Sequence, residues 1–457
     1  LSKKGLITLT CCFNNILNQV TKMSNKKKVF IKTYGCQMNE YDSEKMMLDL
    51  EKNHYEQTSE IQEADMVLLN TCNIREKAAE KVYSELGRIK RFKDHKTDLK
   101  IGVTGCVAQA ESLEIFDRQP AVDFIIGPQS YHKLPDIISK LENGERNIIQ
   151  TSFEASDKFN SISSLTGIIK PSAFVTIQEG CDKFCTFCVV PYTRGKEVSR
   201  SQTDILNEIR EIAAKGTKEV ILLGQNVNAY NFEGVSLSSL IYSISQIVEI
   251  ERIRFMTSHP KDMTDELINA FGNVPKLMPF LHLPVQSGSS KILKSMNRGH
   301  VVEEYVEIIN RLRSVRKDIC FSSDFIVGYP GETDEDFQET INLCEQVKFA
   351  QAYSFNYSSR PGTPASRKQA LDENLKKKRL HALQELLNGQ QTDFLEKQKD
   401  RQHNVLFEKK GRRKNEYVGR TEQFSPVTVV SKENLVGQIR RVKINSIMSH
   451  SLKGILK

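Results

Sequence analysis

The sequence lacks any apolar run long enough to cross a membrane. Its longer runs, such as EVILLG at 219–224, fall far short of the roughly 18 residues that a spanning helix needs. The opening LSKKGLITLTCCF imitates a signal peptide, but no small-residue cleavage site follows it. We therefore expect a cytoplasmic protein without a membrane segment, a translation start at Met23, and a disordered extension over residues 1–26.

Dense, paired cysteines are also missing. Ten cysteines are spread over 457 residues, which excludes the small secreted scaffold that disulfides hold together. In a reducing compartment, clustered cysteines are more often metal ligands. The length exceeds what one ordinary core fills, so it predicts two or three domains.

Positive charge has no excess before residue 401. Residues 1–400 hold 52 Lys and Arg against 53 acidic residues, whereas residues 401–457 hold thirteen against four. The net charge of +8 therefore arises in the last segment. Such localised charge is typical of nucleic-acid binding, and a solvated basic tail is the alternative.

A unit repeats three times between Val29 and about Lys140: a β-type run, a turn, a cysteine and a helical pattern. The cysteines are Cys36, Cys72 and Cys106. Alternating strands and helices predict a doubly wound parallel α/β domain over residues 27–145. Because parallel strands end at one edge of the sheet, we expect the three thiols to lie near one another. The alternative is three unrelated buried cysteines.

The rest of the chain predicts two further folded parts. Residues 146–170 are polar and are predicted to be a linker. Residues 171–365 predict a (βα)6-type partial barrel, with chemistry at the carboxyl ends of its strands. Its predicted strands are 173–178, 219–224, 252–258, 279–285, 319–328 and 350–358. Residues 366–400 predict a connecting helix, and five short strands in 401–457 predict a small all-β, OB-like barrel.

Three more cysteines stand close together in GCDKFCTFC, at Cys181, Cys185 and Cys188. A zinc site would need a fourth ligand, but no second cysteine pair is near and the next histidine downstream is His259. A disulfide would join two of the three thiols and leave the third unpaired, and disulfides are rare in a reducing compartment. An iron-sulfur cluster suits the spacing best, and three cysteines would leave one of its irons without a protein ligand.

The Cys-x-x-x-Cys-x-x-Cys pattern after the first barrel strand resembles the signature of radical S-adenosylmethionine (SAM) enzymes. From Val29 onward, the order of parts resembles the methylthiotransferase family, whose last module is an RNA-binding TRAM domain. The resemblance implies that Cys181, Cys185 and Cys188 bind a 4Fe-4S cluster whose open iron holds SAM. It implies an auxiliary 4Fe-4S cluster at Cys36, Cys72 and Cys106.

Weaker motifs of the same family imply SAM contacts. Gly224 and Gln225 stand where many relatives carry Gly-Gly-Glu, and Asp324 and Gly328 belong to DFIVGYPGE, which resembles the segment against the SAM adenine. Ordinary loop closure is the alternative for these turns. No catalytic side chain is implied, since the chemistry belongs to the clusters.

Several short sequence motifs resemble those of the branch of the family that acts on prenylated adenosine in tRNA. The motifs are TYGCQMNEYDSE, LNTCNIREKA, GCVAQ, GQNVNAY, LHLPVQSGS, MNRGH and DFIVGYPGET. They imply methylthiolation of carbon 2 of N(6)-dimethylallyladenosine at tRNA position 37, using two SAM: one methylates a sulfur held at the auxiliary cluster, and the other is cleaved to a radical.

Two kinds of alternative function stand beside this hypothesis, which also implies partners. Gln37, Met38 and Asn39 after Cys36 disfavour the branches that act on threonylcarbamoyladenosine tRNA or on a ribosomal-protein aspartate. A non-catalytic, zinc-dependent RNA-binding protein is the alternative of another class. The implied partners are a tRNA anticodon stem-loop and an electron donor such as flavodoxin or ferredoxin. The sulfur donor stays unidentified, and we expect a monomer.

Overall fold

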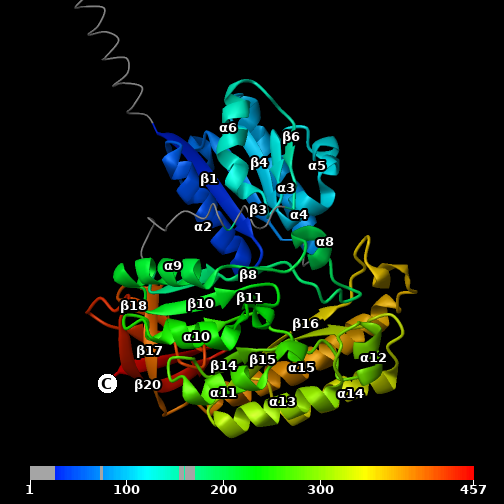
Figure 1. Ribbon diagram of the computed structural model, residues 1–457, viewed down its shortest axis with the longest axis vertical. Helices are drawn as coiled ribbons and strands as arrows, with labels where there is room; N and C mark the ends of the chain where they lie inside the picture. The colour runs from blue at the N-terminus through cyan, green and yellow to red at the C-terminus, as the bar shows by residue number, and fades with distance from the viewer. Residues whose placement is uncertain (1–25, 73–75, 154–158, 160–169) are drawn as a thin grey trace, which may run out of the picture. The chain divides into compact units, whose positions relative to one another are not determined.

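The computed structural model describes residues 26–72, 76–153, 159 and 170–457, so nearly all of the predicted extension lies outside the described residues. It divides into two compact units, Leu1–Ser163 and Ser164–Lys457 (Figure 1). In these ranges no helix is long and apolar enough to cross a membrane.

The first unit is a six-stranded parallel sheet in the order β2-β1-β3-β4-β5-β6. Its strands are β1 Lys27–Tyr34, β2 Tyr55–Gln57, β3 Met66–Thr71, β4 Lys100–Gly105, β5 Phe124–Ile126 and β6 Ile148–Gln150. Its helices are α2 Gln37–Lys52, α3 Glu76–His95, α4 Cys106–Glu111, α5 Leu113–Arg118 and α6 Leu134–Glu142. The edge strand β6 falls within the stretch predicted as a linker.

Both faces of this sheet are covered, which explains why β3 is apolar along most of its length. All six β3 residues are buried. Leu68 packs with the cluster that includes α6 residues, whereas Val67 and Leu69 pack with the cluster that includes α3 residues. Successive side chains of a strand point to opposite faces, so a continuous apolar run indicates a strand buried on both sides. The predicted doubly wound domain is confirmed.

The second unit begins with a partial barrel of six parallel strands in two sheets, β7-β10-β13 and β14-β15-β16. A parallel bridge between Ile253 and Leu277 joins the sheets. The strands are β7 Ser172–Thr176, β10 Glu219–Leu223, β13 Arg252–Phe255, β14 Phe280–His282, β15 Cys320–Val327 and β16 Gln351–Asn356. These are the six predicted strands; each is shorter than predicted, and β7 begins one residue earlier.

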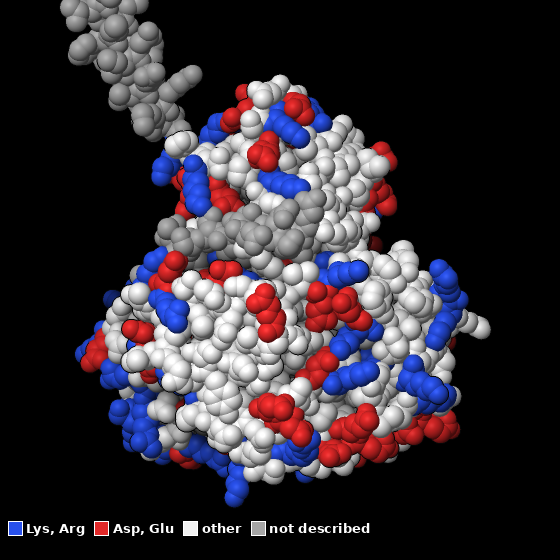
Figure 2. Space-filling model, in the orientation of Figure 1, with Lys and Arg blue, Asp and Glu red and all other residues white. Residues whose placement is uncertain are grey.

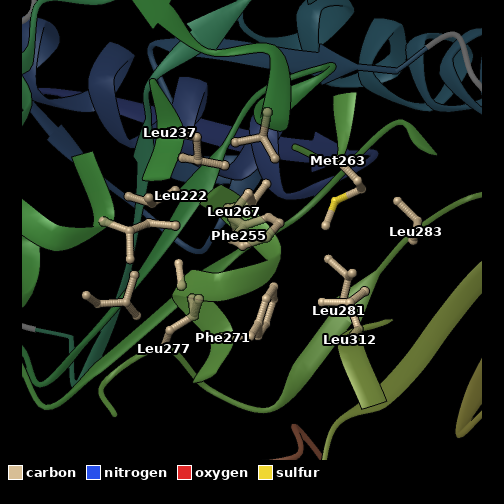
Figure 3. Close-up of a cluster of buried hydrophobic side chains, with 14 of the residues drawn as sticks. Leu222, Leu237, Phe255, Met263, Leu267, Phe271, Leu277, Leu281, Leu283 and Leu312 are labelled. Carbon is tan, nitrogen blue, oxygen red and sulfur yellow. The ribbon is translucent and has the colours of Figure 1, made fainter. Parts of the chain in front are cut away.

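Helices cover the outside of this barrel, and their buried side chains pack against those of the strands. They are α9 Gln202–Ala214, α10 Leu237–Ser245, α11 Asp265–Asn273, α12 Ser290–Ser295, α13 Val302–Val315 and α14 Asp334–Val347. Their starts are set by hydroxyl caps such as Ser201, Thr264 and Thr333. Side chains from strands and helices, among them Leu222, Phe255 and Phe271, interlock in one core (Figure 3).

The chain ends in a closed five-stranded barrel in the order β17-β18-β19-β21-β20. Its strands are β17 Gln402–Lys410, β18 Glu416–Arg420, β19 Pro426–Val430, β20 Ile439–Met448 and β21 Ser451–Leu456, which confirms the predicted small β-barrel. Helix α15, Glu373–Glu396, leads into it. Leu383 and Leu387 of α15 belong to the core of the large barrel, whereas Leu395 belongs to that of the small one. One helix therefore contributes to both cores.

Two buried arginines of β13 dock the small barrel onto the large one. Arg254 donates from Nε to Glu219 Oε2 at 2.8 Å, from Nη1 to the carbonyl of Glu422 at 2.8 Å and from Nη2 to that of Thr421 at 2.9 Å. Arg252 donates to the carbonyls of Arg420 at 3.0 Å and of Asn404 at 2.7 Å. These contacts lie at the amino-terminal ends of β10 and β13, which leaves the carboxyl ends of the strands open for chemistry.

Candidate functional site

The cysteine loop of the second unit starts where the first strand of the large barrel ends. The short strands β8, Gln178–Glu179, and β9, Val198–Ser199, pair around it. Gly180 has φ +80°, and a Cβ there would collide with the carbonyl of Lys196, so glycine is required. Farther along, Thr186 donates from its amide to the carbonyl of Met296 at 3.0 Å. The loop is thereby tied down at both ends.

The three thiols of this loop are close enough to act on one another electrostatically. Burial, with the neighbouring cysteines adding to it, raises the pKa of Cys181 to about 11 and that of Cys188 to about 12. Both are therefore protonated thiols near neutral pH, and a bound metal would displace those protons. Cys185 is buried.

A cubane cluster fits this donor set better than a single ion does. Among the described residues, no three His, Cys, Asp or Glu side chains converge as a mononuclear metal site requires. A four-iron cluster takes one ligand on each of several irons, so its thiolates stand farther apart. The cysteines recorded there, Cys181, Cys185 and Cys188 included, are also outside any disulfide.

Gln178 and Gln225 join the turn after β10 to the cysteine loop. Gln225 accepts from the amide of Gly180 at 2.6 Å, and Gln178 accepts from the amide of Gln225 at 3.0 Å. A Cβ on Gly224 would stand 2.5 Å from Gln178 Oε1, so this turn needs glycine for close packing. The side chain of Gln225 thus positions the loop, and a SAM contact by Gly224 or Gln225 stays a prediction.

Asp324 and Gly328 lie on or just after β15. Asp324 Oδ2 is 3.5 Å from Nε2 of His282. Gly328 has φ +70°, its amide donates to Glu332 at 3.1 Å, and a Cβ there would collide with the stem of Lys376. The glycine is explained by this packing, and the SAM contacts of both residues also stay predictions.

Sequence reasoning missed a set of buried polar groups near the cysteine loop. Arg298 donates from Nη1 to Cys185 Sγ at 3.5 Å and from Nη2 to the carbonyl of Pro284 at 2.5 Å. His259 and His300 stack edge to face, with ring centroids 5.7 Å apart. Burial, followed by the charge of Arg298, lowers the pKa of His259 to about 2 and that of His300 to about 4, so both are neutral.

Within the part of the chain that the structure describes, four buried polar atoms of this region have no hydrogen-bond partner. They are Nε2 of His259, Nε2 of His300, Nε of Arg298 and Oδ1 of Asn226. Buried polar atoms are normally hydrogen-bonded, so a polar ligand beside the thiols would supply partners that these atoms lack. The signal for it was present in SHP and MNRGH, but their separation in the sequence concealed it.

In the first unit, the register of three adjacent strands brings the other cysteines together. Tyr34 pairs with Thr71, and Thr71 pairs with Gly105. Cys36 and Cys106 begin α2 and α4, and Cys72 directly follows β3. A Cβ on Gly35 would stand 2.5 Å from Cβ of Cys72, so the turns that carry these two cysteines touch. The three cysteines therefore lie at one edge of the sheet, while the convergence of their thiols and a shared cluster stay predictions.

An asparagine pair fixes the first two of these turns. Asn39 donates to Oδ1 of Asn70 at 3.0 Å, and Asn70 donates back to the carbonyl of Asn39 at 2.8 Å. Oδ1 of Asn39 also lies 3.4 Å from both the amide and Sγ of Cys36. Both asparagines are buried. They hold the start of α2 against the end of β3.

The last two residues of β17 and the turn that leads to β18 carry five exposed cations, which we name the basic turn: Lys409, Lys410, Arg412, Arg413 and Lys414. Glu416 shapes it by accepting from the amides of Arg412 and Arg413 at 3.0 and 3.2 Å. Lysine and arginine gather at the lower left of the second unit, where Figure 1 labels β17, β18 and β20 (Figure 2). The predicted basic segment therefore forms an exposed positive surface.

Known proteins resemble the chain along almost all of its length. Residues 28–127 match the family described as uncharacterized protein family UPF0004, and residues 175–344 match the radical SAM superfamily. A tRNA-2-methylthio-N(6)-dimethylallyladenosine synthase of Ruegeria sp. (strain TM1040) is 52% identical over 439 residues, which cover 95% of this chain and 100% of that protein. One of Maricaulis maris (strain MCS10) is 53% identical, covering 95% and 98%.

Solved structures resemble the fold at low sequence identity. The radical SAM methyltransferase TsrM of Kitasatospora setae has a TM-score of 0.58 at 12% identity, covering 75% of each chain. The cobalamin-dependent radical SAM enzyme OxsB has a TM-score of 0.51 at 14% identity, covering 79% of this chain and 56% of that one. At such identities the likeness supports the architecture alone.

Proposed function

The chain belongs to the family of the tRNA-2-methylthio-N(6)-dimethylallyladenosine synthases, and from that premise we propose that it methylthiolates carbon 2 of N(6)-dimethylallyladenosine at tRNA position 37. The observation that carries the proposal is the presence of two separate cysteine triplets, one in each unit, at the carboxyl ends of parallel strands. A reaction that adds both sulfur and methyl to an unactivated carbon needs a radical generator and a sulfur carrier. Two cluster sites can divide these tasks.

The chain's own residues would hold the cofactors in these two places. Cys181, Cys185 and Cys188 would bind one 4Fe-4S cluster together with SAM, and Cys36, Cys72 and Cys106 would bind the auxiliary one. When bound, the first supplies the electron that cleaves SAM to a carbon radical, and the second holds the sulfur to be transferred. Gln178 and Gln225 fix the first cysteine loop against the turn after β10.

The substrate, by this proposal, is recognised by the positive surface of the small barrel as well as at the clusters. The five cations of the basic turn make no ion pair within the described part of the chain and suit the phosphates of an anticodon stem-loop. Gly224, Gln225, Asp324 and Gly328 are the proposed SAM contacts. A flavodoxin or ferredoxin would supply electrons to a monomeric enzyme in the cytoplasm.

The decisive assay supplies the reconstituted protein with SAM, sulfide, a reductant and anticodon stem-loops that do or do not carry the prenyl group. Nucleoside mass spectrometry should show the methylthio group on the prenylated RNA alone. Equal activity on both RNAs would refute the assigned substrate. Metal analysis should give about eight irons per chain, as two cubanes require.

Cysteine variants separate the two sites. Cys185→Ala should abolish SAM cleavage, whereas Cys72→Ala should block the product and leave some SAM cleavage without product. Cys344→Ala is the matched control, because Cys344 is fully buried in α14 within the hydrophobic core and should leave the iron content unchanged. Complete loss of SAM cleavage in Cys72→Ala would contradict separate roles.

A further inference from the structure

Arg298 differs from the other buried arginines in what neutralises its charge. Most of them form ion pairs with buried carboxylates: Arg194 with Glu179, Arg200 with Glu208, Arg254 with Glu219 and Arg379 with Glu332. Arg252 lies in the field of Glu219 and Glu422. Arg298 is 6% exposed, yet no carboxylate in the described ranges pairs with it. An unpaired buried charge is costly, so this guanidinium requires an anion that the protein's carboxylates do not supply.

The group in place to be that anion is a sulfur. Nη1 of Arg298 lies 3.5 Å from Sγ of Cys185, within hydrogen-bonding distance for sulfur. Nη2 is held by the carbonyl of Pro284, and the carbonyl of Arg298 itself is 3.1 Å from Nδ1 of His300. The carbonyl of Pro284 therefore holds the guanidinium, His300 holds the backbone that carries it, and Nη1 points at one thiol.

The neighbouring side chains leave the guanidinium of Arg298 as the dominant positive charge at the thiol of Cys185. His259 and His300, which flank Arg298, are neutral. Lys183, the cation of the cysteine loop itself, has its Nζ 2.7 Å from Asp262. Hydrogen bonds to the sulfurs of an iron-sulfur cluster and nearby positive charge favour the reduced form, because reduction adds a negative charge.

We propose that Arg298 is a positioning residue that hydrogen-bonds the Cys185 ligand of the SAM-cleaving cluster and raises its reduction potential, so that a cellular reductant can load the electron. The inference rests on the proposed function of the Cys181, Cys185 and Cys188 site. It concerns the sulfur, and it is distinct from a contact of Arg298 with the SAM carboxylate.

The test uses the full chain with Cys36, Cys72 and Cys106 replaced by alanine, so that one cluster remains. Its midpoint potential is measured without SAM, by redox titration followed by electron paramagnetic resonance. Arg298→Met should lower the reduction equilibrium constant at least tenfold, which for one electron is about 59 mV. Arg298→Gln should also lower the midpoint, because the charge is lost. The control Lys183→Gln, which removes a cation paired to a carboxylate, should shift it several-fold less.

Each outcome is decisive. An unchanged midpoint in both Arg298 variants overturns the inference, and a tenfold weaker SAM affinity at that unchanged midpoint would assign Arg298 to the carboxylate of SAM instead. If Arg298→Met fails to assemble a cluster, Arg298→Gln decides by the same criterion, and failure of both to assemble one overturns the tuning role in favour of a structural one. Absence of any cluster while Arg298 is intact refutes the proposed function itself.

Discussion

Arg252 and Arg254, which we call the arginine clamp, dock the small barrel onto the large one. Their contacts predict how much stability the loss of Arg254 should cost. Arg254→Met leaves Glu219, which is 1% exposed, without its direct ion-pair partner and removes the donors to two carbonyls. Breaking a buried pair in this way costs about 3–5 kcal/mol. The small barrel keeps its own core of ten buried residues, so the loss should undock it while it stays folded.

Hydrogen exchange is the suitable assay, since the sequence has no tryptophan to report unfolding. A cost of about 4 kcal/mol corresponds to roughly a thousandfold loss of protection at 1.36 kcal/mol per decade. The loss should be confined to amides at the junction, around Thr421 and Ser425. Arg311→Met is the matched control, because its ion pair with Asp265 is exposed and worth at most about 1 kcal/mol.

The companion variant is Glu219→Gln combined with Arg254→Met. It removes both charges, so its cost should fall below the sum of the two single costs by about 0.5–3 kcal/mol, as coupled neighbours do. Additive costs would show that the pair is not coupled. A loss of protection below tenfold in Arg254→Met alone would refute the clamp.

Three further predictions concern other parts of the chain. Asn39→Leu should leave Oδ1 of Asn70 without its donor, whereas Nδ2 of Asn70 keeps the main-chain carbonyl of residue 39 and Oγ of Ser43. The cost should be about 1–3 kcal/mol, and the iron content should fall from about eight toward four; unchanged iron would contradict the positioning role. Replacing the five cations of the basic turn with glutamine should lower the slope of log affinity against log salt by up to about 3.5, whereas glutamine at exposed Lys377 and Lys378 should leave it nearly unchanged. Burial raises the pKa of Asp336, but hydrogen bonds from Lys291, Thr333 and Ser289 outweigh this and lower it to about 2. Asp336 therefore stabilises the fold above its unfolded pKa of about 3.9, and the cost of Asp336→Asn, measured by urea unfolding, should be full at pH 6 and shrink as the pH falls toward 2; a constant cost would contradict this.

Much of the architecture could be predicted because local patterns determine it. Continuous apolar runs such as that of β3 indicate strands buried on both faces, and a cysteine after each run places the thiols at one sheet edge. The carboxyl-end rule for parallel sheets then groups Cys36, Cys72 and Cys106 without knowledge of the strand order. The strand order in the structure adds what the sequence did not specify: β1, β3 and β4 are direct neighbours in the sheet.

Contacts between distant segments could not be predicted in this way. Arg298 is 113 residues beyond Cys185, and nothing in MNRGH shows which sulfur its arginine meets. No local pattern showed that the side chain of Gln225, a predicted SAM contact, accepts from the amide of Gly180. Arg254 lies inside a strand whose pattern indicates burial, but the partner that makes its burial tolerable comes from β10. Such pairings depend on the assembled partial barrel, which no local pattern encodes.

The clamp of Arg252 and Arg254 has a consequence for how the two barrels can diverge. Four of its five hydrogen bonds end on main-chain carbonyls of the small barrel, and the fifth joins side chains of the large barrel. The docking hydrogen bonds therefore do not depend on which side chains the small barrel carries at positions 404, 420 and 421. Substitutions at these positions can change the surface that the small barrel offers to RNA, while the main-chain hydrogen bonds that dock this barrel stay the same.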